Sequence, residues 1–334
     1  MNKIKIKDSL YLVKKSDDIY SAIFTGIRRI KTFKADALVK KILISLHEPL
    51  EENILYDKLK DFSEKDITLC INSLEKIGLL RKYDNQNIDN RYSKQIAFID
   101  ELSESWEETL KLHNKLKNSK ISIFGIGGIG TWMTNGVYQM GVNEIKITDP
   151  DVISESNLNR QLFFDSGDIG KYKVDVIKNK LPDANIIPYK KKVSKDESLE
   201  ELISNSDFLI NCADSPSVSE TTEIIDSYAR PKKIPYCVAG GYNMHLGMIG
   251  PIIVPGKTKS FNDFLESQKK EDPLKNLKII KDIKNPGNLG AVAGAVANMQ
   301  LMEIFKHIIG KGTHNYNRFA EIDFMDLRID WRDF

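Results

Sequence analysis

The chain has 334 residues, which is enough for two domains, and its 49 basic and 47 acidic residues leave a net charge of +2. This balance excludes a strongly basic nucleic-acid binder and an acidic solvating tail, while 41% hydrophobic and 29% charged residues are typical of a folded globular protein. No apolar run approaches the roughly 18 residues that a membrane span needs, and the first seven residues alternate lysine with isoleucine instead of forming a signal-peptide core.

Residues 1–85 are predicted to form a small winged-helix-like module. Two apolar segments separated by Asp17 and Asp18 indicate a β-hairpin, and a third segment can extend its sheet. Of the three helices that follow, the last has the clearest signals, because Ser63 and Asp66 resemble a capping box and Gly78 ends the helix. In chain order, the expected strands and helices of the module cover residues 10–13, 19–24, 27–33, 38–46, 51–59, 63–77 and 79–83.

The polar stretch 84–90 is interpreted as a linker, and beyond it the pattern changes to strand, glycine turn, helix, strand. Alternating strands and helices predict that residues 86–334 form an α/β domain with a Rossmann-like, mainly parallel sheet and helices on both faces. Residues 257–284 are rich in Lys, Asp and Asn and are expected to be a mobile loop with a helical piece. The expected strands cover residues 121–124, 144–148, 207–212 and 236–239, with one or two edge strands within 319–331.

A glycine-rich turn follows the first strand of this domain and opens a helix. Its glycines, Gly125, Gly127, Gly128 and Gly130, let backbone N–H groups approach a phosphate or a ribose at the positive end of the helix. Asp149 stands nineteen residues after Gly130, at the end of the next strand, where a carboxylate accepts hydrogen bonds from a ribose. The pattern indicates a nucleotide, such as that of a dinucleotide dehydrogenase, and a tight turn without a ligand is the alternative.

The residues that follow Asp149 favour a nucleoside triphosphate over a dinucleotide. Arg160 and, thirteen residues further on, Lys173 are cations of the kind that a triphosphate losing pyrophosphate needs over its leaving phosphates. Asp214 follows a later strand and would face the same cleft, where a carboxylate suits Mg²⁺ better than it suits hydride transfer. Arg160, Lys173 and Asp214 are therefore predicted to be catalytic, with Asp214 as the metal ligand.

Several motifs follow one another in a fixed order within residues 91–310. They are Arg91-Tyr-Ser-Lys94-Gln95, the glycine turn, Ser-Asn-Leu-Asn-Arg-Gln at 156–161, Gly170-x-x-Lys173, the Asp214 turn and the segment 288–303. With these motifs the chain resembles the E1-like adenylating family that includes ThiF, MoeB and HesA. Members of this family bind ATP and Mg²⁺ and form an acyl-adenylate on the C-terminus of a peptide or protein. The resemblance therefore implies an ATP- and Mg²⁺-dependent adenylyltransferase that works as a homodimer.

The same resemblance implies a set of cofactor-binding residues. The ribose would be bound by Asp149, the phosphates by Asn157, Arg160 and Lys173, and the magnesium ion by Asp214. The whole predicted set is Gly125, Gly127, Gly128, Gly130, Asp149, Asp151, Asn157, Arg160, Gln161 and Lys173.

The first motif implies a catalytic cation that acts in trans. In the family, a basic residue of this motif reaches the ATP that is bound by the partner subunit. The matching position here is Lys94 in place of arginine, and Arg91 stands nearby. Lysine keeps the charge but loses the two-pronged geometry of a guanidinium, so either Arg91 or Lys94 is expected to serve.

Three cysteines, Cys70, Cys212 and Cys237, are too few and too far apart for a disulfide framework and fit a reducing cytoplasm. Most members of the resembled family hold a structural zinc ion with two CxxC pairs. Here Ser260 and Asp263 stand where the first pair belongs, so no zinc is expected. Thiol-transferring members carry a later cysteine, but none follows Cys237, and Cys212 and Cys237 are interpreted as small buried side chains. A thioester or persulfide relay is therefore not expected.

The N-terminal module narrows the resemblance to one branch of the family. Sulfur-carrier activators begin close to the first motif, whereas about 90 residues precede it here. Peptide-modifying members of the MccB and PaaA type, which act in microcin C and pantocin formation, are the better match. Their module resembles a recognition element that binds a precursor peptide at a sheet edge beside its third helix. A DNA-binding role is disfavoured because helix 63–77 is not notably basic, and a structural or dimerising role stays open.

The predicted function is adenylation of a carboxylate or carboxamide on a small ribosomal peptide during maturation of a peptide antibiotic. The activated group then either keeps the nucleotide, as in microcin C, or is captured internally to form a ring, as in pantocin. The predicted partners are a precursor peptide and a second copy of the chain, without nucleic acid or membrane, in the cytoplasm. The alternatives are a sulfur-carrier adenylyltransferase that acts on a ubiquitin-like C-terminal Gly-Gly, and a non-catalytic leader-binding scaffold, which the intact Arg160, Lys173 and Asp214 disfavour.

Overall fold

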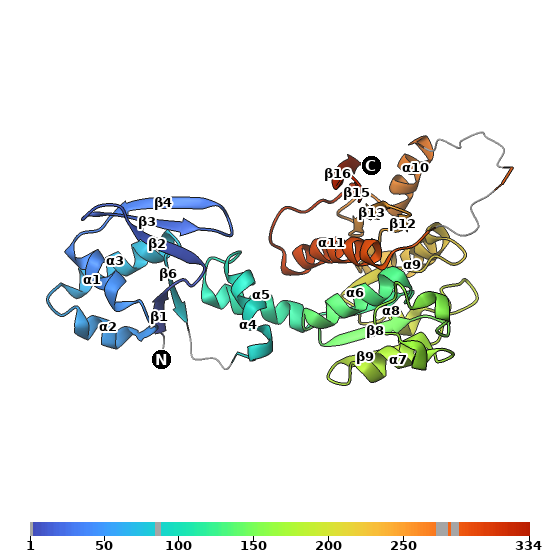
Figure 1. Ribbon diagram of the computed structural model, residues 1–334, viewed down its shortest axis with the longest axis horizontal. Coiled ribbons are helices and arrows are strands. Elements are labelled where there is room, and N and C mark those ends of the chain that lie inside the picture. Colours follow the sequence, from blue (N-terminus) through green and yellow to red (C-terminus); the bar gives the residue numbers. More distant parts are fainter. Residues whose placement is uncertain (1–2, 84–87, 272–279, 282–286) are drawn as a thin grey trace. The chain divides into compact units, whose positions relative to one another are not determined.

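The chain folds into two compact units, Met1–Asn114 and Lys115–Phe334, which we term unit 1 and unit 2 and describe separately. Within the described part of the chain, no helix is both long enough and apolar enough to cross a membrane. The computed structural model describes residues 3–83, 88–271, 280–281 and 287–334 (Figure 1).

Unit 1 contains two three-stranded antiparallel sheets. In the first sheet β3 lies in the middle and pairs with β2 and β4, as the predicted hairpin and its extension require. In the second sheet β1 pairs with both β5 and β6, so the charged N-terminal stretch forms a strand that its pattern did not predict. The strands cover Lys3–Ile6 (β1), Leu10–Lys14 (β2), Ile19–Phe24 (β3), Arg29–Lys34 (β4), Leu50–Glu51 (β5) and Leu80–Tyr83 (β6).

Three helices complete the module and pack their apolar faces into one buried cluster with the strands. The Ser63 hydroxyl accepts a hydrogen bond from the N–H of Asp66 at 3.1 Å, which confirms the predicted cap. Behind this cap, Ile67, Ile71 and Leu74 recur at helical spacing and are buried. The helices cover Ala37–Ser45 (α1), Glu52–Lys58 (α2) and Glu64–Lys76 (α3).

The C-terminal end of helix α3 contacts strand β4. The Lys31 Nζ of β4 donates a hydrogen bond to the carbonyl oxygen of Ile77, at the end of α3, at a distance of 2.7 Å. Burial, and next the nearby Asp36 carboxylate just beyond β4, raise the pKa of the Cys70 thiol in the middle of α3 to about 11. Among the described strands, β4 pairs only with β3. Its other edge, which we term the β4 edge (residues 29–34), is therefore open to a further strand.

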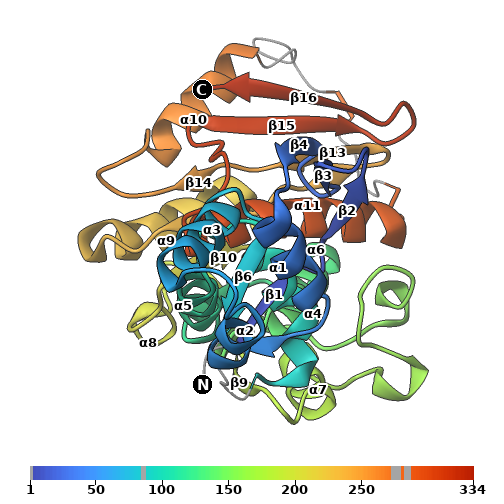
Figure 2. The same ribbon diagram turned by 90° about the vertical axis from the view of Figure 1, so that its left-hand side faces the viewer.

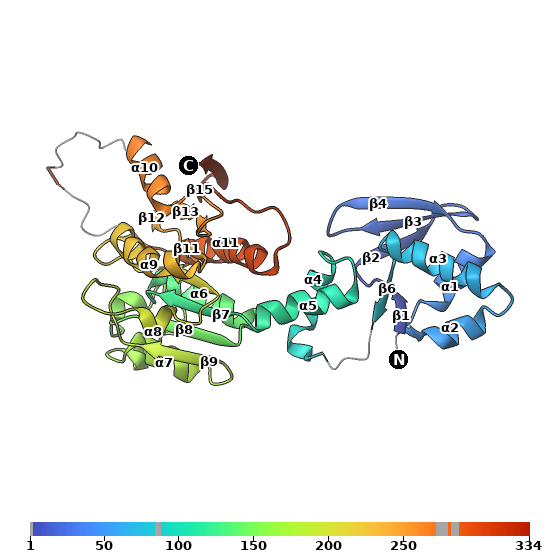
Figure 3. The same ribbon diagram turned by 180° about the vertical axis from the view of Figure 1, so that it is seen from behind.

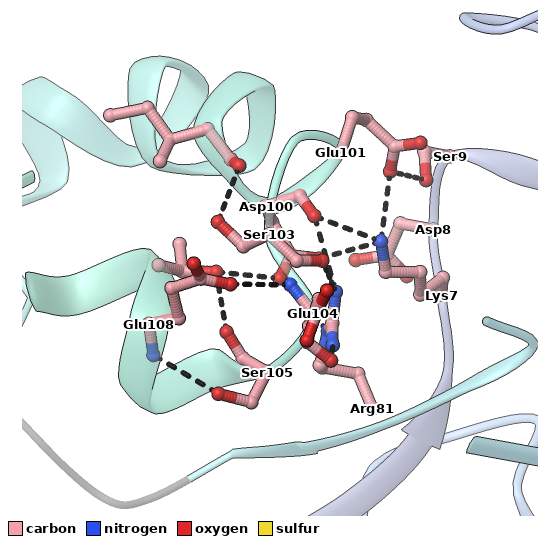
Figure 4. A network of polar contacts seen from close by, with 12 residues as sticks. Lys7, Asp8, Ser9, Arg81, Asp100, Glu101, Ser103, Glu104, Ser105 and Glu108 are labelled. Atoms are coloured by element: carbon pink, nitrogen blue, oxygen red, sulfur yellow. Dashed lines mark hydrogen bonds and ion pairs between the residues drawn. The ribbon is translucent and has the colours of Figure 1, made fainter. Parts of the chain in front are cut away.

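A buried charge cluster connects the segment after the predicted linker to β6 and to Lys7, the residue that follows β1 (Figure 4). The Lys7 Nζ lies 3.2 Å from Asp100 Oδ2 and 3.3 Å from Glu101 Oε1, while the Arg81 Nε lies 2.9 Å from Asp100 Oδ1. Removing one partner of such a buried pair leaves an uncompensated charge, which costs about 3–5 kcal/mol. The segment consists of a short 3₁₀ turn, Asn90–Tyr92 (η1), and the helices Ser93–Asp100 (α4) and Trp106–Lys117 (α5).

Unit 2 is built on a six-stranded sheet in the order β14-β11-β10-β7-β8-β9. The five strands β7 to β11 are parallel and β14 is antiparallel, which confirms the predicted Rossmann-like sheet. The strands cover Lys120–Phe124 (β7), Glu144–Thr148 (β8), Asn185–Tyr189 (β9), Phe208–Asn211 (β10), Tyr236–Val238 (β11) and Ile252–Ile253 (β14).

Helices cover both faces of this sheet, as two consecutive residues of β10 show. The Phe208 ring lies 5.2 Å from the ring of His307 on α11, whereas Leu209 packs on the opposite face in a cluster with Leu202 and Ile225 of α8 and α9. On the first face α11 lies along α6 (Figures 1 and 3). The helices cover Gly128–Gln139 (α6), Lys173–Lys180 (α7), Glu200–Ile203 (α8), Val218–Lys232 (α9) and Gly290–Ile309 (α11).

A second, antiparallel sheet in the order β12-β13-β15-β16 ends unit 2. Strands β15 and β16 lie side by side in Figure 2 and confirm the predicted terminal edge strands, whereas β12 and β13 were not predicted. The strands cover Tyr242–Asn243 (β12), Leu246–Ile249 (β13), Arg318–Asp323 (β15) and Arg328–Asp333 (β16).

The predicted loop 257–284 contains the expected helical piece, Phe261–Glu271 (α10). Ser260 and Asp263, which stand where the resembled family has zinc-binding cysteines, instead form the start of this helix. The carboxylate of Asp263 accepts hydrogen bonds from the backbone N–H and the hydroxyl of Ser260, each at a distance of 2.7 Å. The rest of the predicted loop, like residues 84–87 of the predicted linker, lies largely outside the described residues.

Candidate functional site

A cleft of about 630 Å³ opens at the carboxyl ends of the parallel strands of unit 2. In open α/β sheets this edge is where ligands bind, because the turns after several strands meet there. Loops that follow β7, β8, β10 and β11 form its walls. The predicted residues that line the cleft are Gly125, Gly127, Gly128, Asp149, Asp151, Asn157, Arg160, Gln161, Lys173 and Asp214.

The glycine turn is explained by a lack of space for side chains. Gly125 has a φ of 84°, and a Cβ there would lie 2.6 Å from the backbone nitrogen of Ala213. At Gly130 a Cβ would lie only 1.9 Å from the carbonyl oxygen of Gly125. Gly130 is not among the residues lining the cleft, so its observed role is to let α6 pack against the turn. The unpaired N–H groups of the first turn of α6 form a positive helix end beside the cleft.

Asp149 is buried at the end of β8 and holds the glycine turn in place. Its Oδ2 accepts a hydrogen bond from the N–H of Ile126 at 2.6 Å, and its Oδ1 accepts one from the N–H of Asp151 at 2.8 Å. Burial raises the pKa of the Asp149 carboxyl, while the positive charge of Lys173 opposes the shift. The Lys173 Nζ lies 3.4 Å from Asp149 Oδ1 and 2.8 Å from Asp151 Oδ2, so this buried cation starts α7 with two carboxylate partners.

The loop after β8 brings an amide, a guanidinium and a second amide to the cleft. The Asn157 Oδ1 accepts from the N–H of Ser154 at 3.1 Å and closes a 3₁₀ turn, Glu155–Asn157 (η2). The Arg160 guanidinium donates to the carbonyl oxygen of Ser156. The Gln161 side chain is only 7% exposed, and its Oε1 has no hydrogen-bond partner. A buried acceptor without a partner in a cleft fits a site that is completed by a donor on a ligand, such as a ribose hydroxyl.

Asp214 is exposed to the cleft two residues after Cys212. In the described structure its carboxylate forms no hydrogen bond or ion pair, while the loop around it is fixed. The Asn211 Oδ1 accepts from the N–H of Ala213 at 3.0 Å, and the Thr221 hydroxyl donates to the Ala213 carbonyl oxygen at 2.8 Å. Mg²⁺ in such sites takes one or two carboxylates and completes its shell with water and substrate phosphates. The donor set therefore fits a magnesium ion brought in with a nucleotide, although the described residues contain no cluster of three acidic, His or Cys side chains.

Several residues of the cleft were missed or misplaced by the sequence analysis. Lys191 and Lys192, which were expected to be a solvated strand end, line the cleft just beyond β9. The Tyr242 hydroxyl lies beside Arg160 and stands over the glycine turn, where a Cβ on Gly128 would be 2.6 Å from it. Burial raises the pKa of the Tyr242 phenol. Tyr242 lies in a strand that was not predicted. The Gly-Gly pair before it was the one sequence signal that this segment could lie close to a ligand.

Arg91 and Lys94, the two candidates for a cation acting in trans, are not among the residues lining the cleft. Both are exposed on unit 1, on η1 and at the start of α4. Asp89 accepts a hydrogen bond from the backbone N–H of Arg91 at 3.0 Å and caps this turn.

The cysteine side chains are poor nucleophiles. Cys237 is buried in β11, as predicted, whereas Cys212 lies just after β10 and lines the cleft. Burial raises the pKa of the Cys212 and Cys237 thiols above the ordinary range for cysteine. At neutral pH both are therefore protonated, which disfavours a thiolate relay at the cleft.

The arrangement is suited to a polyphosphate. Four cations line the cleft, and only Lys173 among them is held between carboxylates at close range. The positive end of α6 adds to this field, and the unpartnered Asp214 stands across from the glycine turn. Fixed cations and N–H groups of this kind stabilise charge that develops on phosphates as a bond to phosphorus breaks. The four cations are Arg160, Lys173, Lys191 and Lys192.

Known proteins resemble the chain in sequence and in fold. The model of the ThiF family matches residues 92–334. The SAMP-activating enzyme E1 of Haloferax volcanii is 24% identical over 245 residues, which are 72% of this chain and 83% of that protein. E. coli MccB solved with ATP has a TM-score of 0.74 at 20% identity, covering 100% of this chain and 97% of that one. PaaA has a TM-score of 0.74 at 21% identity, covering 98% of this chain and 99% of that one. At such identities the two structures show the fold alone.

Proposed function

The chain belongs to the ThiF family and is an ATP-dependent adenylyltransferase, and we propose that it activates a carboxylate or carboxamide of a small ribosomal peptide. One observation carries the proposal: a single cleft gathers the glycine turn, Asp149, Arg160 and Asp214, although they are spread over three strand-to-helix connections. A dinucleotide would leave the cations beyond the glycine turn without a phosphate to compensate. A triphosphate uses all of them, because its leaving pyrophosphate needs compensation.

The proposed binding mode assigns each part of ATP to a part of the cleft. The α-phosphate lies at the first turn of α6, and Asp149 and the unpartnered amide of Gln161 bind the ribose hydroxyls. Arg160, Lys173 and Asn157 face the phosphates, with Lys191 and Lys192 at the open side. Support comes from their shared position along the cleft and from the unsatisfied Gln161 Oε1.

The proposed reaction is an in-line displacement at the α-phosphorus. An oxygen of the peptide carboxylate or carboxamide forms a bond to phosphorus as the bond to the bridging oxygen breaks, and pyrophosphate leaves with the electron pair. The chain holds the two reactants in line and compensates the charge on the leaving phosphates, without a covalent enzyme intermediate. The raised pKa of the Cys212 thiol supports a route that needs no thiolate.

The proposed magnesium ligand is Asp214, and a bound ion would supply positive charge that compensates the phosphates. We expect Asp214→Asn to raise the Mg²⁺ concentration for half-maximal ATP–pyrophosphate exchange about tenfold or more, because the amide carries no charge for the ion. Chelation with EDTA should abolish exchange in the unaltered chain. The matched control is Glu220→Gln, which removes an exposed carboxylate at the start of α9 outside the cleft. An unchanged Mg²⁺ requirement in Asp214→Asn would remove this residue from the metal site.

The N-terminal module is proposed to bind the leader of the precursor peptide as an added strand on the β4 edge. The open edge of β4, and the contact between β4 and the end of α3, support this mode, in which backbone hydrogen bonds give affinity and neighbouring side chains give specificity. MccB, whose fold this chain shares, has been solved in complex with N-formylated MccA. Peptide binding by this chain rests on the geometry of the β4 edge.

A bulky side chain on α3 beside the β4 edge should block the leader. Ser73 is exposed on the flank of α3 that carries Cys70, whereas Asn72 is exposed nearer the flank where Thr68 meets Tyr56 of α2. We expect Ser73→Trp to weaken leader binding tenfold or more and Asn72→Trp to leave it nearly unchanged. Fluorescence anisotropy of the labelled peptide encoded beside the gene measures this, with nucleotide affinity as the folding control. Equal affinities for the two variants would place the leader elsewhere.

A homodimer is proposed in which Arg91 or Lys94 of one protomer serves the cleft of its partner. Chains carrying Arg91→Ala with Lys94→Ala, and chains carrying Asp214→Asn, should each be nearly inactive. Mixed dimers would hold one site with both parts intact, so mixing should restore roughly a quarter of the normal exchange rate. A mixture no more active than the separate variants, at a mass that confirms dimers, would contradict action in trans.

The competing function is adenylation of a ubiquitin-like sulfur carrier, which the likeness to the SAMP-activating enzyme E1 favours. The decisive experiment incubates the whole chain with ATP, Mg²⁺ and either the short peptide encoded beside its gene or a carrier ending in Gly-Gly. Mass spectrometry then reads the product. A nucleotide adduct on the peptide would indicate a product that keeps the nucleotide, and a loss of water would indicate ring formation. Either result supports the proposal. Pyrophosphate exchange with the carrier alone would establish the competing function.

A further inference from the structure

A second cavity, of about 580 Å³, adjoins the cleft in unit 2 and differs from it in chemistry. Among the described residues that line it, most are apolar and none is Lys, Arg, Asp or Glu, and two polar residues, His245 and Asn288, complete the wall. Several apolar side chains here are unusually exposed: Met244 by 56%, Leu289 by 60% and Met325 by 76%. An exposed apolar concavity with a few polar groups is a common form of binding site. The apolar lining residues are Met244, Leu289, Val292, Ala295, Phe324 and Met325.

This cavity is continuous with the proposed nucleotide cleft. Asn288 lines both of them, and Met244 of the cavity lies in the turn after β12, two residues after Tyr242 of the cleft. Two residues of chain span at most roughly 7 Å, which is the reach of a peptide from one residue to the next but one. The first turn of α11 also borders both, since a Cβ on Gly290 would lie 2.8 Å from the carbonyl oxygen of Asn159, next to Arg160. A molecule reacting at the α-phosphate can therefore extend directly into the cavity.

We propose that this cavity receives an apolar side chain of the substrate peptide, within two residues of the group that is adenylated. The inference rests on the proposed function and makes the substrate more specific. The described lining of the cavity has no Lys or Arg, so the cavity does not suit the triphosphate, which needs the cations of the cleft. Its volume exceeds that of a single leucine or phenylalanine side chain, so the cavity seats such a side chain while His245 and Asn288 remain to face the peptide backbone.

The test uses the whole chain with ATP, Mg²⁺ and an equimolar library of hexapeptides randomised at the last three positions. Fragment masses locate the modified group in each product and identify its neighbours. We expect products with Leu, Ile, Met or Phe within two residues of that group to exceed those with Gly or Ser about tenfold or more. Ala295→Leu should fill the cavity and remove this preference, whereas Phe324→Leu should enlarge it and shift the preference toward Trp.

Matched measurements separate the possible outcomes. Asn298→Leu adds the same side chain to an exposed position of α11 outside the cavity and should keep the preference. If the wild-type preference survives in Ala295→Leu, or if products form without any preference, the cavity does not read the peptide. If Ala295→Leu changes the mass in solution but not the preference, the occupant is a second copy of the chain, and the inference fails. If ATP binds but neither the library nor the gene-adjacent peptide reacts, the proposed function itself fails.

Discussion

Replacing Arg160 with lysine is expected to lower kcat/KM for ATP–pyrophosphate exchange about a hundredfold, and replacement with alanine about a thousandfold. The guanidinium is held in place by the Ser156 carbonyl oxygen and, at 3.2 Å, by the Oδ1 of Asn159, so its remaining N–H groups have a fixed direction. A lysine keeps the charge, but it has neither the two-pronged geometry nor the second contact. The loss should fall mainly on kcat, because the leaving pyrophosphate gains charge only as the bond breaks.

The control for this prediction is Arg230→Lys. Arg230 lies on α9 and pairs with Asp226 away from the cleft, so its replacement tests the general effect of losing a guanidinium. Affinity for a non-hydrolysable ATP analogue, measured by calorimetry, separates binding from catalysis. If Arg160→Lys retained the normal kcat, Arg160 would have no part in the chemical step.

Gly130→Ala should destabilise unit 2 by about 3 kcal/mol or more and abolish nucleotide binding. The added Cβ would lie 1.9 Å from the carbonyl oxygen of Gly125, and backbone atoms cannot move aside as a flexible side chain can. The turn must open, which displaces the N–H of Ile126 from Asp149. For a unit of this size, 3 kcal/mol corresponds to roughly 6–12 °C in Tm.

Gly127→Ala is the matched control, because a Cβ at Gly127 meets nothing within 4 Å and its φ is −91°. Calorimetric scans of the two variants without ligand should therefore differ clearly, with Gly127→Ala close to the normal Tm. Similar Tm values would mean that the turn relaxes around Gly130, and that this glycine is not required by space.

The sequence predicted the parallel sheet and most of the cleft because the relevant signals are local. Gly125 and Asp149 directly follow strands, and Arg160 and Lys173 lie in short motifs of the connection after β8, with Lys173 at the start of α7. Parallel topology then brings such strand ends together without further information. The cap at Ser63 was predictable for the same reason, since one hydroxyl and one backbone N–H three residues later define it.

The parts that were missed depend on contacts between distant segments. Tyr242 reaches Arg160 only because β12 joins the second sheet, and that two-residue strand has no pattern of its own. Lys191 and Lys192 resemble any solvated basic run, and only the position of the end of β9 turns them toward the cleft. Strand β1 was missed because its apolar side chains pack on one face while Lys3 and Lys5 look like a charged terminus.

The buried charges at Lys7, Arg81 and Asp100 affect how chimeric enzymes should be made. The ThiF match begins at residue 92, so sequence alone suggests exchanging N-terminal modules between relatives at the linker before it. A cut there would separate Asp100 from both of its cations and leave charges buried on either side of the junction. Helices α4 and α5 should instead travel with the transplanted module, which puts the junction after Lys117, at the end of α5 and just past the boundary between the units. Peptide specificity and the first family motif would then be inherited together, as one exchangeable part.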